Sequence, residues 1–169
     1  LKVWDLKNGR LIGTLNGHAS VVRAVALTSD GQRAVSGSDG RSLNVWDLES
    51  GRMIRTLKGH ASAVRAVALT SDGQRAVSGS DDRTLKVWDL KNGRVIGTLA
   101  GHVGTVKAIA LTSDGQRVVS GSSDRTLKVW DLKSGRVIRT LEGHSGVVRA
   151  AALTSDGQRV VSGSSDRTL

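Results

Sequence analysis

The sequence repeats itself with a period of 42 residues. The tryptophans lie at Trp4, Trp46, Trp88 and Trp130, and the histidines at His18, His60, His102 and His144. The segment TSDGQR keeps the same spacing and begins at Thr28, Thr70, Thr112 and Thr154. A period of this length is the signature of a supersecondary unit that is repeated in space. The chain is therefore expected to fold as an array of similar modules.

Each unit is predicted to consist of four β-strands. In the second complete unit, segments rich in Val, Leu, Ile and Thr cover residues 64–70, 75–80, 84–90 and 94–99, and turn residues separate them. No stretch of the sequence sustains a helical period. Two of the turns contain Asp-Gly or Asn-Gly, which favour tight hairpins because glycine tolerates positive φ angles. The unit is thus predicted to be an antiparallel four-stranded meander.

A single meander of this size has two faces and little core, so it must bury its apolar faces against its neighbours. Radial stacking of such sheets around an axis achieves this and leaves only short exposed edges. The sequence has no Phe, Tyr, Pro or Cys and one Trp per unit, so the core must consist mainly of Val, Leu, Ile and Ala. Small and β-branched side chains favour close contact between thin sheets. The predicted fold class is all-β.

The dipeptides of the repeat carry a family resemblance. Gly-His stands at 17–18, 59–60, 101–102 and 143–144, and Trp-Asp stands at 4–5, 46–47, 88–89 and 130–131. Together with the period, the TSDG turn and the SGSxDRT segment, this pattern resembles the WD40 repeat of β-propellers over the whole chain. The resemblance implies blades of four antiparallel strands with the first strand innermost. In that order the chain comprises a half blade at 1–15, three blades at 21–57, 63–99 and 105–141, and a half blade at 147–169.

The two predicted half blades complement one another. The strand that contains Trp4 can pair with the strand near Val160–Ser164, which removes two exposed sheet edges that would otherwise promote aggregation. Closing four blades into a ring requires about a quarter turn per blade, whereas the blades resemble those of rings with seven or eight members. We therefore expect two chains to join head to tail as a homodimer and to close an eight-bladed ring with two composite blades. The alternative is a compact four-bladed monomer.

The resemblance also implies a structural hydrogen-bonded set of side chains in each blade. By position the sets are His60, Ser78, Asp82 and Trp88, followed by His102, Ser120, Asp124 and Trp130. A buried indole or imidazole N–H costs free energy when it is unpaired, which explains the need for such partners. In the unit of His18 and Trp46, Gly40 stands at the position of the Asp, and Asp39 is the available substitute. We expect this first complete blade to be looser than the others.

The His, Ser and Asp of one unit superficially resemble a hydrolase triad. The set recurs in at least three units, whereas catalysis usually needs one asymmetric constellation in a cleft, so we interpret it as structural. A metal site is not expected either, since each unit supplies one His, no Cys and an Asp that is already assigned to that His. The sequence therefore predicts neither an enzyme nor a cofactor or metal site.

A candidate partner-binding face is indicated by the positions at which the repeats differ. The loop before the first strand and the turn after the second strand vary between units, and the resemblance places both on one face around the channel. A basic residue of the innermost strand adjoins this loop and could contribute to a ring of positive charge. The candidate residues are Ser20, Arg23, Asp39, Ser62, Arg65, Asp81, Lys107 and Arg149. Neutral drift of the repeats, and pairing of the basic residues with nearby Asp, are the alternative interpretations.

Composition limits the partners and the setting. The formal net charge of +10 attracts anionic partners without specifying them. The lack of exposed aromatic residues on which bases could stack argues against nucleic acid. The sequence has no apolar run long enough to cross a membrane, no cysteine and no signal segment at its start, so a cytoplasmic setting is expected.

Three functional hypotheses remain after this reading. The leading one is a non-enzymatic scaffold for an unknown protein or peptide, because the chain resembles the high-identity WD-repeat arrays that serve as recognition arms in larger bacterial signalling proteins. The second is an engineered or fragmentary propeller whose only activity is self-assembly. The third is an anion or nucleic-acid binder that uses a basic ring.

Overall fold

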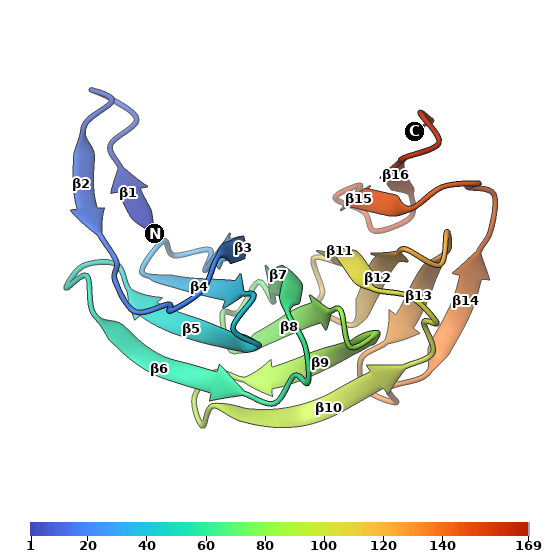
Figure 1. Cartoon of the computed structure of the whole chain (residues 1–169), viewed down its shortest axis with the longest axis horizontal. Helices are drawn as coiled ribbons and strands as arrows, with labels where there is room; N and C mark the ends of the chain where they lie inside the picture. The colour runs from blue at the N-terminus through green and yellow to red at the C-terminus, as the bar shows by residue number, and fades with distance from the viewer. Residues whose placement is uncertain (169) are drawn as a thin grey trace.

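The computed structural model describes residues 1–168 as an open arc of antiparallel β-sheets (Figure 1). The strands are β1 (Lys2–Trp4), β2 (Leu11–Thr14), β3 (Val22–Leu27), β4 (Arg33–Ser38), β5 (Ser42–Asp47), β6 (Met53–Lys58), β7 (Val64–Leu69), β8 (Arg75–Ser80), β9 (Thr84–Asp89), β10 (Arg94–Ala100), β11 (Val106–Leu111), β12 (Arg117–Ser122), β13 (Leu127–Asp131), β14 (Val137–Leu141), β15 (Val148–Leu153) and β16 (Val160–Ser164). Three four-stranded sheets, β3–β6, β7–β10 and β11–β14, lie between the two-stranded sheets β1–β2 and β15–β16. The all-β class and the four-stranded antiparallel sheets are thereby confirmed.

Each sheet is a meander whose first strand lies on the concave side of the arc. Strands β3, β7, β11 and β15 follow one another along this side, and each packs against the next (Figure 1). Strands β6, β10 and β14 form the convex rim (Figure 1). The chain therefore presents the start of every innermost strand, and the loop before it, along one continuous curved edge.

The Asp-Gly and Asn-Gly turns have the backbone geometry that the sequence favours. Gly73, between β7 and β8, has a φ of +63°, and Gly93, between β9 and β10, has a φ of +71°. These values lie in the left-handed region, which glycine adopts without the steric penalty that a Cβ atom brings. The tight reversals keep consecutive strands side by side and so allow the meander to form.

Neighbouring sheets approach closely because the second strand of each blade carries a glycine. A Cβ atom added to Gly79 of β8 would lie only 2.5 Å from Cγ1 of Val106 on β11. The same approach recurs between Gly37 and Val64. Any larger residue at Gly79 would overpack a densely filled contact. The glycine in each SGS segment is therefore what lets one blade stack on the next.

The core lies between neighbouring blades and is centred on one tryptophan per blade. One cluster joins Leu85 and Leu99 of one blade to Val118 and Trp130 of the next. Trp46, Trp88 and Trp130 are each at most 1% exposed. Because each cluster draws on two sheets, a blade cannot bury its apolar residues without a neighbour.

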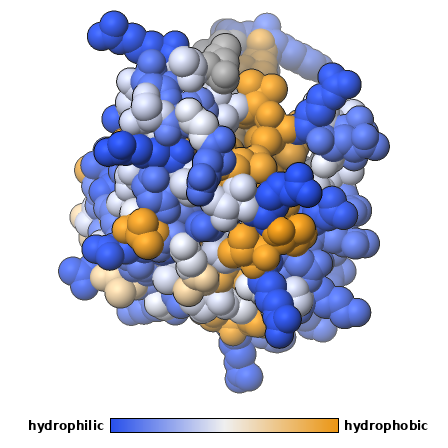
Figure 2. Space-filling view, turned by 90° about the vertical axis from the view of Figure 1, so that its right-hand side faces the viewer, coloured by the Kyte–Doolittle hydropathy of each residue, from blue (hydrophilic) through white to orange (hydrophobic). Residues whose placement is uncertain are grey.

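The two ends of the arc leave equivalent residues exposed. Trp4 is 53% exposed, although its counterparts in the three complete blades are buried, and Val161 of β16 is 56% exposed whereas Val77 is fully buried. Figure 2 looks onto the end that carries β14 to β16 and shows apolar side chains reaching the surface among hydrophilic ones. Each end thus exposes surface that the interior blades bury against a neighbour.

The described residues do not form a closed ring. The β1–β2 and β15–β16 sheets lie at opposite ends of the arc and are separate sheets (Figure 1). The compact four-bladed monomer, the alternative considered from the sequence, is therefore not formed. The eight-bladed ring of two chains stays a prediction. Leu169, the last residue of the predicted half blade at 147–169, lies outside the described residues.

Within residues 1–168, no helix is long and apolar enough to span a membrane.

Candidate functional site

A buried relay of hydrogen bonds runs through the second complete blade. The indole N–H of Trp88 donates to Oγ of Ser78 at 2.7 Å. Oγ of Ser78 lies 2.7 Å from Nε2 of His60, and Nδ1 of His60 lies 2.7 Å from Oδ2 of Asp82. An ionised carboxylate only accepts, so the Nδ1 proton is donated to Asp82 and Nε2 accepts the Ser78 hydroxyl proton. Every donor in the relay then has one acceptor.

The environment of the relay fixes its charge state. Burial would by itself raise the pKa of Asp82, but hydrogen bonds from Thr84 and His60 lower it to about 2. Burial lowers the pKa of His60 below its ordinary value of 6.5 and outweighs the hydrogen bond to Asp82, which raises it. At neutral pH the carboxylate is therefore charged and the imidazole is neutral, as the relay requires.

Asp82 also ties two loops to the blade. Its carboxylate accepts the backbone N–H of Ala61 at 2.9 Å and that of Thr84 at 3.0 Å. Arg83 lies between Asp82 and Thr84 with a φ of 69°, a conformation that costs a non-glycine residue roughly 1–2 kcal/mol. The carboxylate thus holds both the loop before β7 and a strained turn after β8.

The third complete blade contains the same relay. Trp130, Ser120, His102 and Asp124 are joined in that order by contacts of 2.7 Å. Within the described residues, no buried side-chain nitrogen or oxygen lacks a partner. Both four-residue sets that the resemblance implied are therefore brought together by the structure.

The Ser, His and Asp of each relay are arranged as in a hydrolase triad, but they cannot act as one. Ser78 and Ser120 are fully buried, and each hydroxyl oxygen already accepts an indole N–H. A nucleophile must reach a substrate carbonyl in an open site, and these oxygens do not. Within residues 1–168, no group of three or more His, Cys, Asp or Glu side chains is placed to hold a metal ion.

The first complete blade holds only part of the relay. Trp46 donates to Ser36 at 2.8 Å, and Ser36 contacts Nε2 of His18 at 2.7 Å. Gly40 occupies the position of the Asp, and the suggested substitute, Asp39, does not take its place. The carboxylate of Asp39 is instead engaged by arginine side chains. His18 is correspondingly more exposed than its counterpart His60.

The C-terminal half blade contains a further relay that the sequence reading did not single out. Nδ1 of His144 lies 2.9 Å from Oδ2 of Asp166, and Nε2 lies 2.9 Å from Oγ of Ser162. No indole completes this set within the described residues. The signal that could have identified it is the period itself, since each residue stands 42 positions after its counterpart in the third complete blade.

Six of the eight candidate partner-binding residues, together with two serines at the repeat positions of Asp39 and Asp81, form a line of charged and polar side chains, here called the inner face, along the start of the innermost strands. Its members are Arg23, Asp39, Arg65, Asp81, Lys107, Ser123, Arg149 and Ser165. Arg23 contacts Asp39 at 2.7 Å, and Arg65 reaches both Asp81 at 2.5 Å and Asp39 at 3.0 Å. Hydrogen bonds from Arg23 and Arg65, respectively, lower the pKa values of Asp39 and Asp81. The N-terminal half of the inner face is therefore a compensated ladder that links two blades.

The C-terminal half of the inner face lacks these carboxylates. Serines stand at 123 and 165 in place of the aspartates. Lys107 lies 3.9 Å from Asp81, which Arg65 already engages, and Arg149 donates to Ser165 at 2.6 Å. Pairing of the basic residues with nearby Asp is the sequence-based alternative to a ring of positive charge. That pairing is present in the N-terminal half of the inner face and not in the C-terminal half.

The two serines predicted for this face have other surroundings. The backbone carbonyl of Ser62 accepts a hydrogen bond from Ser80 at 3.1 Å. Ser20 lies beside Gly40, where a Cβ atom would be 3.6 Å from the Ser20 Oγ. Both residues belong to the loops that precede the innermost strands, and within residues 1–168 no hydrogen bond joins either side chain to the charge ladder.

Comparison with known proteins identifies the repeats. A family model described as "WD domain, G-beta repeat" matches residues 9–47, 51–89, 93–131 and 135–169. An uncharacterized WD repeat-containing protein of the yeast Schizosaccharomyces pombe is 40% identical over 43 residues. This match covers 25% of the present chain and 11% of the yeast protein, so it has about the length of one repeat.

Replacing Gly40 by Asp is expected to stabilise the first complete blade. Asp82 already occupies the equivalent position beside Ser80, so the backbone accepts a side chain there. The new carboxylate can accept from Nδ1 of His18, which should raise the free energy of unfolding by about 1 kcal/mol. Amide hydrogen exchange in β3–β6 should slow. Gly40→Ala is the control, and an equal gain in that variant would show that the carboxylate plays no part.

Acidification is expected to destabilise the protein in two stages. In the folded protein the pKa values of His60 and His102 are lowered below the ordinary value of 6.5. As the pH falls below 6.5, the unfolded chain therefore binds more protons than the folded one, and the free energy of unfolding decreases. The pKa of Asp82 and of Asp124 is about 2 instead of 3.8, so their contribution is complete above pH 3.8 and is lost toward pH 2. The urea midpoint measured from pH 8 to pH 2 tests this. A midpoint that is constant between pH 7 and pH 5 would contradict the histidine assignment.

Proposed function

Because the chain belongs to the WD repeat family, we propose that it is a non-enzymatic scaffold that binds an acidic segment of another protein on its inner face. The fold hosts many functions, so the proposal has to rest on particular residues. The His and Ser side chains of the relays in the second and third complete blades are buried. The residues of the inner face are at least partly exposed and can meet a partner on the concave side of the arc.

One observation carries the proposal, and it is the uneven charge of the inner face. Arg23 and Arg65 are neutralised by two aspartates, whereas Arg149 donates to a serine hydroxyl and Lys107 has only the more distant Asp81, which it shares with Arg65. A lysine and an arginine on neighbouring strands can bind a carboxylate by charge-assisted hydrogen bonds, and the serine hydroxyls can donate further hydrogen bonds to it. An acidic peptide that lies along the arc is therefore expected to bind preferentially to the C-terminal half of the inner face.

Anion or nucleic-acid binding through a basic ring draws on the same charges. The compensated half weakens this reading, because the basic residues do not form a continuous positive ring. Nucleic acid without sequence preference also requires aromatic faces for stacking, and three of the four tryptophans are buried. An acidic peptide needs only the local pair of cations and is the better match.

Self-assembly is a second candidate, favoured by the two unpaired half blades. The β1–β2 sheet and the β15–β16 sheet each supply two strands, and together they supply the four of a complete blade. Joining two chains head to tail as a homodimer would create two composite blades and an eight-bladed ring. The scaffold and the assembly are compatible, because the half blades would join at the ends of the arc, whereas the inner face runs along its concave side (Figure 1).

The cellular setting is part of the proposal. A cytoplasmic location, within a larger bacterial signalling protein, is supported by the lack of cysteine and by the near identity of the repeats. Proteins that need no disulfides are typical of reducing compartments.

Replacing Ser123 by Asp is expected to weaken the binding of an acidic peptide. The new carboxylate stands beside Lys107 as Asp81 stands beside Arg65, and so compensates the free half of the inner face. The dissociation constant of a fluorescein-labelled peptide of alternating Glu and Ser should rise about three- to tenfold. This is the effect expected when the peptide loses one surface ion pair, with Lys107, and part of a second, with the neighbouring Arg149. Fluorescence anisotropy at fixed salt measures it.

The matched control is Gln116→Glu, which changes the net charge equally. Gln116 is exposed in the turn between β11 and β12, at the opposite end of the hairpin from Lys107. It should leave the dissociation constant nearly unchanged. If both variants weaken binding alike, only the overall charge acts, and the inner face is not the site.

The molar mass in solution tests the second candidate. Light scattering coupled to size-exclusion chromatography should give twice the chain mass of 17.7 kDa. The two half blades lie at opposite ends of the arc. In a dimer, each half blade of one copy would be covered by the complementary half blade of the other. A species of one chain mass at all concentrations would show that no second copy completes the half blades and that the self-assembly proposal is wrong.

A further inference from the structure

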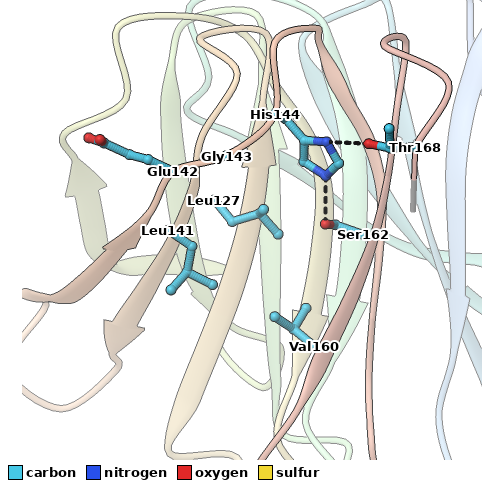
Figure 3. A pocket seen from close by; sticks show the side chains of 8 residues that line it. All are labelled: Leu127, Leu141, Glu142, Gly143, His144, Val160, Ser162 and Thr168. Atoms are coloured by element: carbon cyan, nitrogen blue, oxygen red, sulfur yellow. Dashed lines mark hydrogen bonds between the residues drawn. The ribbon is translucent and has the colours of Figure 1, made fainter.

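A cavity of about 350 Å³ opens at the C-terminal end of the arc. Its lining includes Leu127, Leu141, Gly143, His144, Val160 and Ser162 (Figure 3). Leu127 and Leu141 lie on one side of it, and the imidazole of His144 and the hydroxyl of Ser162 lie on the other, with Val160 on the same strand as Ser162 (Figure 3). The cavity is therefore shaped for an apolar group that also carries a polar atom.

The same surroundings enclose a tryptophan in the preceding blade. Shifting the six lining residues back by one period of 42 gives Leu85, Leu99, Gly101, His102, Val118 and Ser120. Leu85, Leu99 and Val118 belong to the buried cluster that contains Trp130, and Ser120 accepts the indole N–H. The cavity is thus a tryptophan site without its indole.

The glycine at the mouth of the cavity supports this identification. A Cβ atom on Gly101 would lie 3.2 Å from Cη2 of Trp130, because the indole edge rests against the glycine. A Cβ atom on the equivalent Gly143 would meet no atom within 4 Å. The volume that Trp130 fills in the third complete blade is open at the C-terminal end.

The polar side of the cavity is prepared for an N–H donor. Ser162 lies 2.9 Å from Nε2 of His144, and the hydroxyl proton is donated to that nitrogen when Nδ1 donates to Asp166. Oγ of Ser162 then keeps a lone pair that its counterpart Ser120 uses to accept the Trp130 indole. An aromatic ring without an N–H would leave this acceptor unused.

Trp4 is the tryptophan that fits the register. It lies on β1, it is 53% exposed, and it stands four periods before the position that would follow Trp130. In the third complete blade Val118 of β12 is opposite Trp130 of β13. The equivalent pairing places Val160 of β16 opposite Trp4. Within one chain these strands lie at opposite ends of the arc (Figure 1).

We propose that the indole of Trp4 from a second copy of this chain fills the cavity beside His144 and donates its N–H to Oγ of Ser162. The inference rests on the proposed self-assembly and assigns the residues that lock it. β1 of the second copy pairs with β16 and completes the relay from Trp4 through Ser162 and His144 to Asp166. The site is incomplete without the residue that the other copy contributes.

The surfaces around the two sites agree with this occupant. Val161, 56% exposed, would lie opposite Val3 of the second copy, as Val119 lies opposite Val129 in the third complete blade. Val119 is 3% exposed. The apolar surface at the β15–β16 end, part of which is seen in Figure 2, would be covered by the same contact. Burial of this surface supplies the driving force, and the indole hydrogen bond fixes the register.

The test uses variants of the full chain and measures the dimer dissociation constant by concentration-dependent light scattering. Trp4→Ala removes the whole anchor from both composite blades and should raise the dissociation constant about a hundredfold or more. Trp4→Phe keeps an aromatic ring but loses the N–H, and should raise it roughly tenfold. In a Ser162→Ala background, Trp4→Phe should add little, because the acceptor is already gone.

The matched control is Ile12→Ala in the same half blade. Ile12 is exposed, and its counterparts Ile54 and Ile96 stay about half exposed in complete blades, so it is not expected to enter the composite core. Its dissociation constant should match that of the unchanged chain. Circular dichroism of each variant confirms that the three complete blades are still folded.

Acrylamide quenching of tryptophan fluorescence locates the indole. In the unchanged chain the exposed fraction that Trp4 contributes should disappear as the dimer forms. A dimer whose dissociation constant is insensitive to Trp4→Ala would overturn this inference and leave the self-assembly proposal standing. A species of one chain mass whose Trp4 is quenched by acrylamide would overturn both. A monomer in which Trp4 is protected would place the indole within its own chain and would also overturn the inference.

Discussion

The buried indole N–H of one tryptophan per blade is the constraint on which the structure depends. Trp88 lies on the third strand of its blade, and an N–H buried there without an acceptor would cost about 1–3 kcal/mol. Ser78 on the second strand accepts it, His60 in the preceding loop accepts from the serine, and Asp82 in the next turn accepts from the histidine. A single hydrogen-bond requirement thereby fixes two strands, a loop and a turn. The loop and the turn are the segments that border the inner face.

The sequence is sufficient to predict the elements of the fold because each period repeats the same local signals. Asp-Gly and Asn-Gly fix the hairpins, and the alternation of β-branched residues fixes the strands between them. The curvature of the arc could not be predicted in this way. It depends on how closely two sheets approach, for instance where Val106 lies against Gly79, and strand patterns do not encode that distance.

In the candidate site, too, contacts within one repeat unit could be predicted from the sequence, whereas contacts between blades could not. The resemblance identified His60, Ser78, Asp82 and Trp88 because their partners are at fixed positions within one unit. It did not indicate that Asp39 would be drawn away from His18, since Asp39 is engaged by an arginine of the next blade at 3.0 Å as well as by its own. Competition between partners on different blades can be read only from coordinates. The half-compensated inner face has the same origin.

Because the repeats are nearly identical, contacts between blades and contacts with the proposed partner must depend on different residues. A relay built from the same residue types in successive repeats cannot distinguish one of these blades from another, so it can join strands from different chains as readily as strands from one chain. Recognition of a partner must therefore depend on the positions that break the repeat. Ser123 and Ser165 are such positions, because they change the charge of the inner face without touching any relay. In the proposed dimer the repeated residues would join the blades, and the exceptions would determine what the inner face can bind.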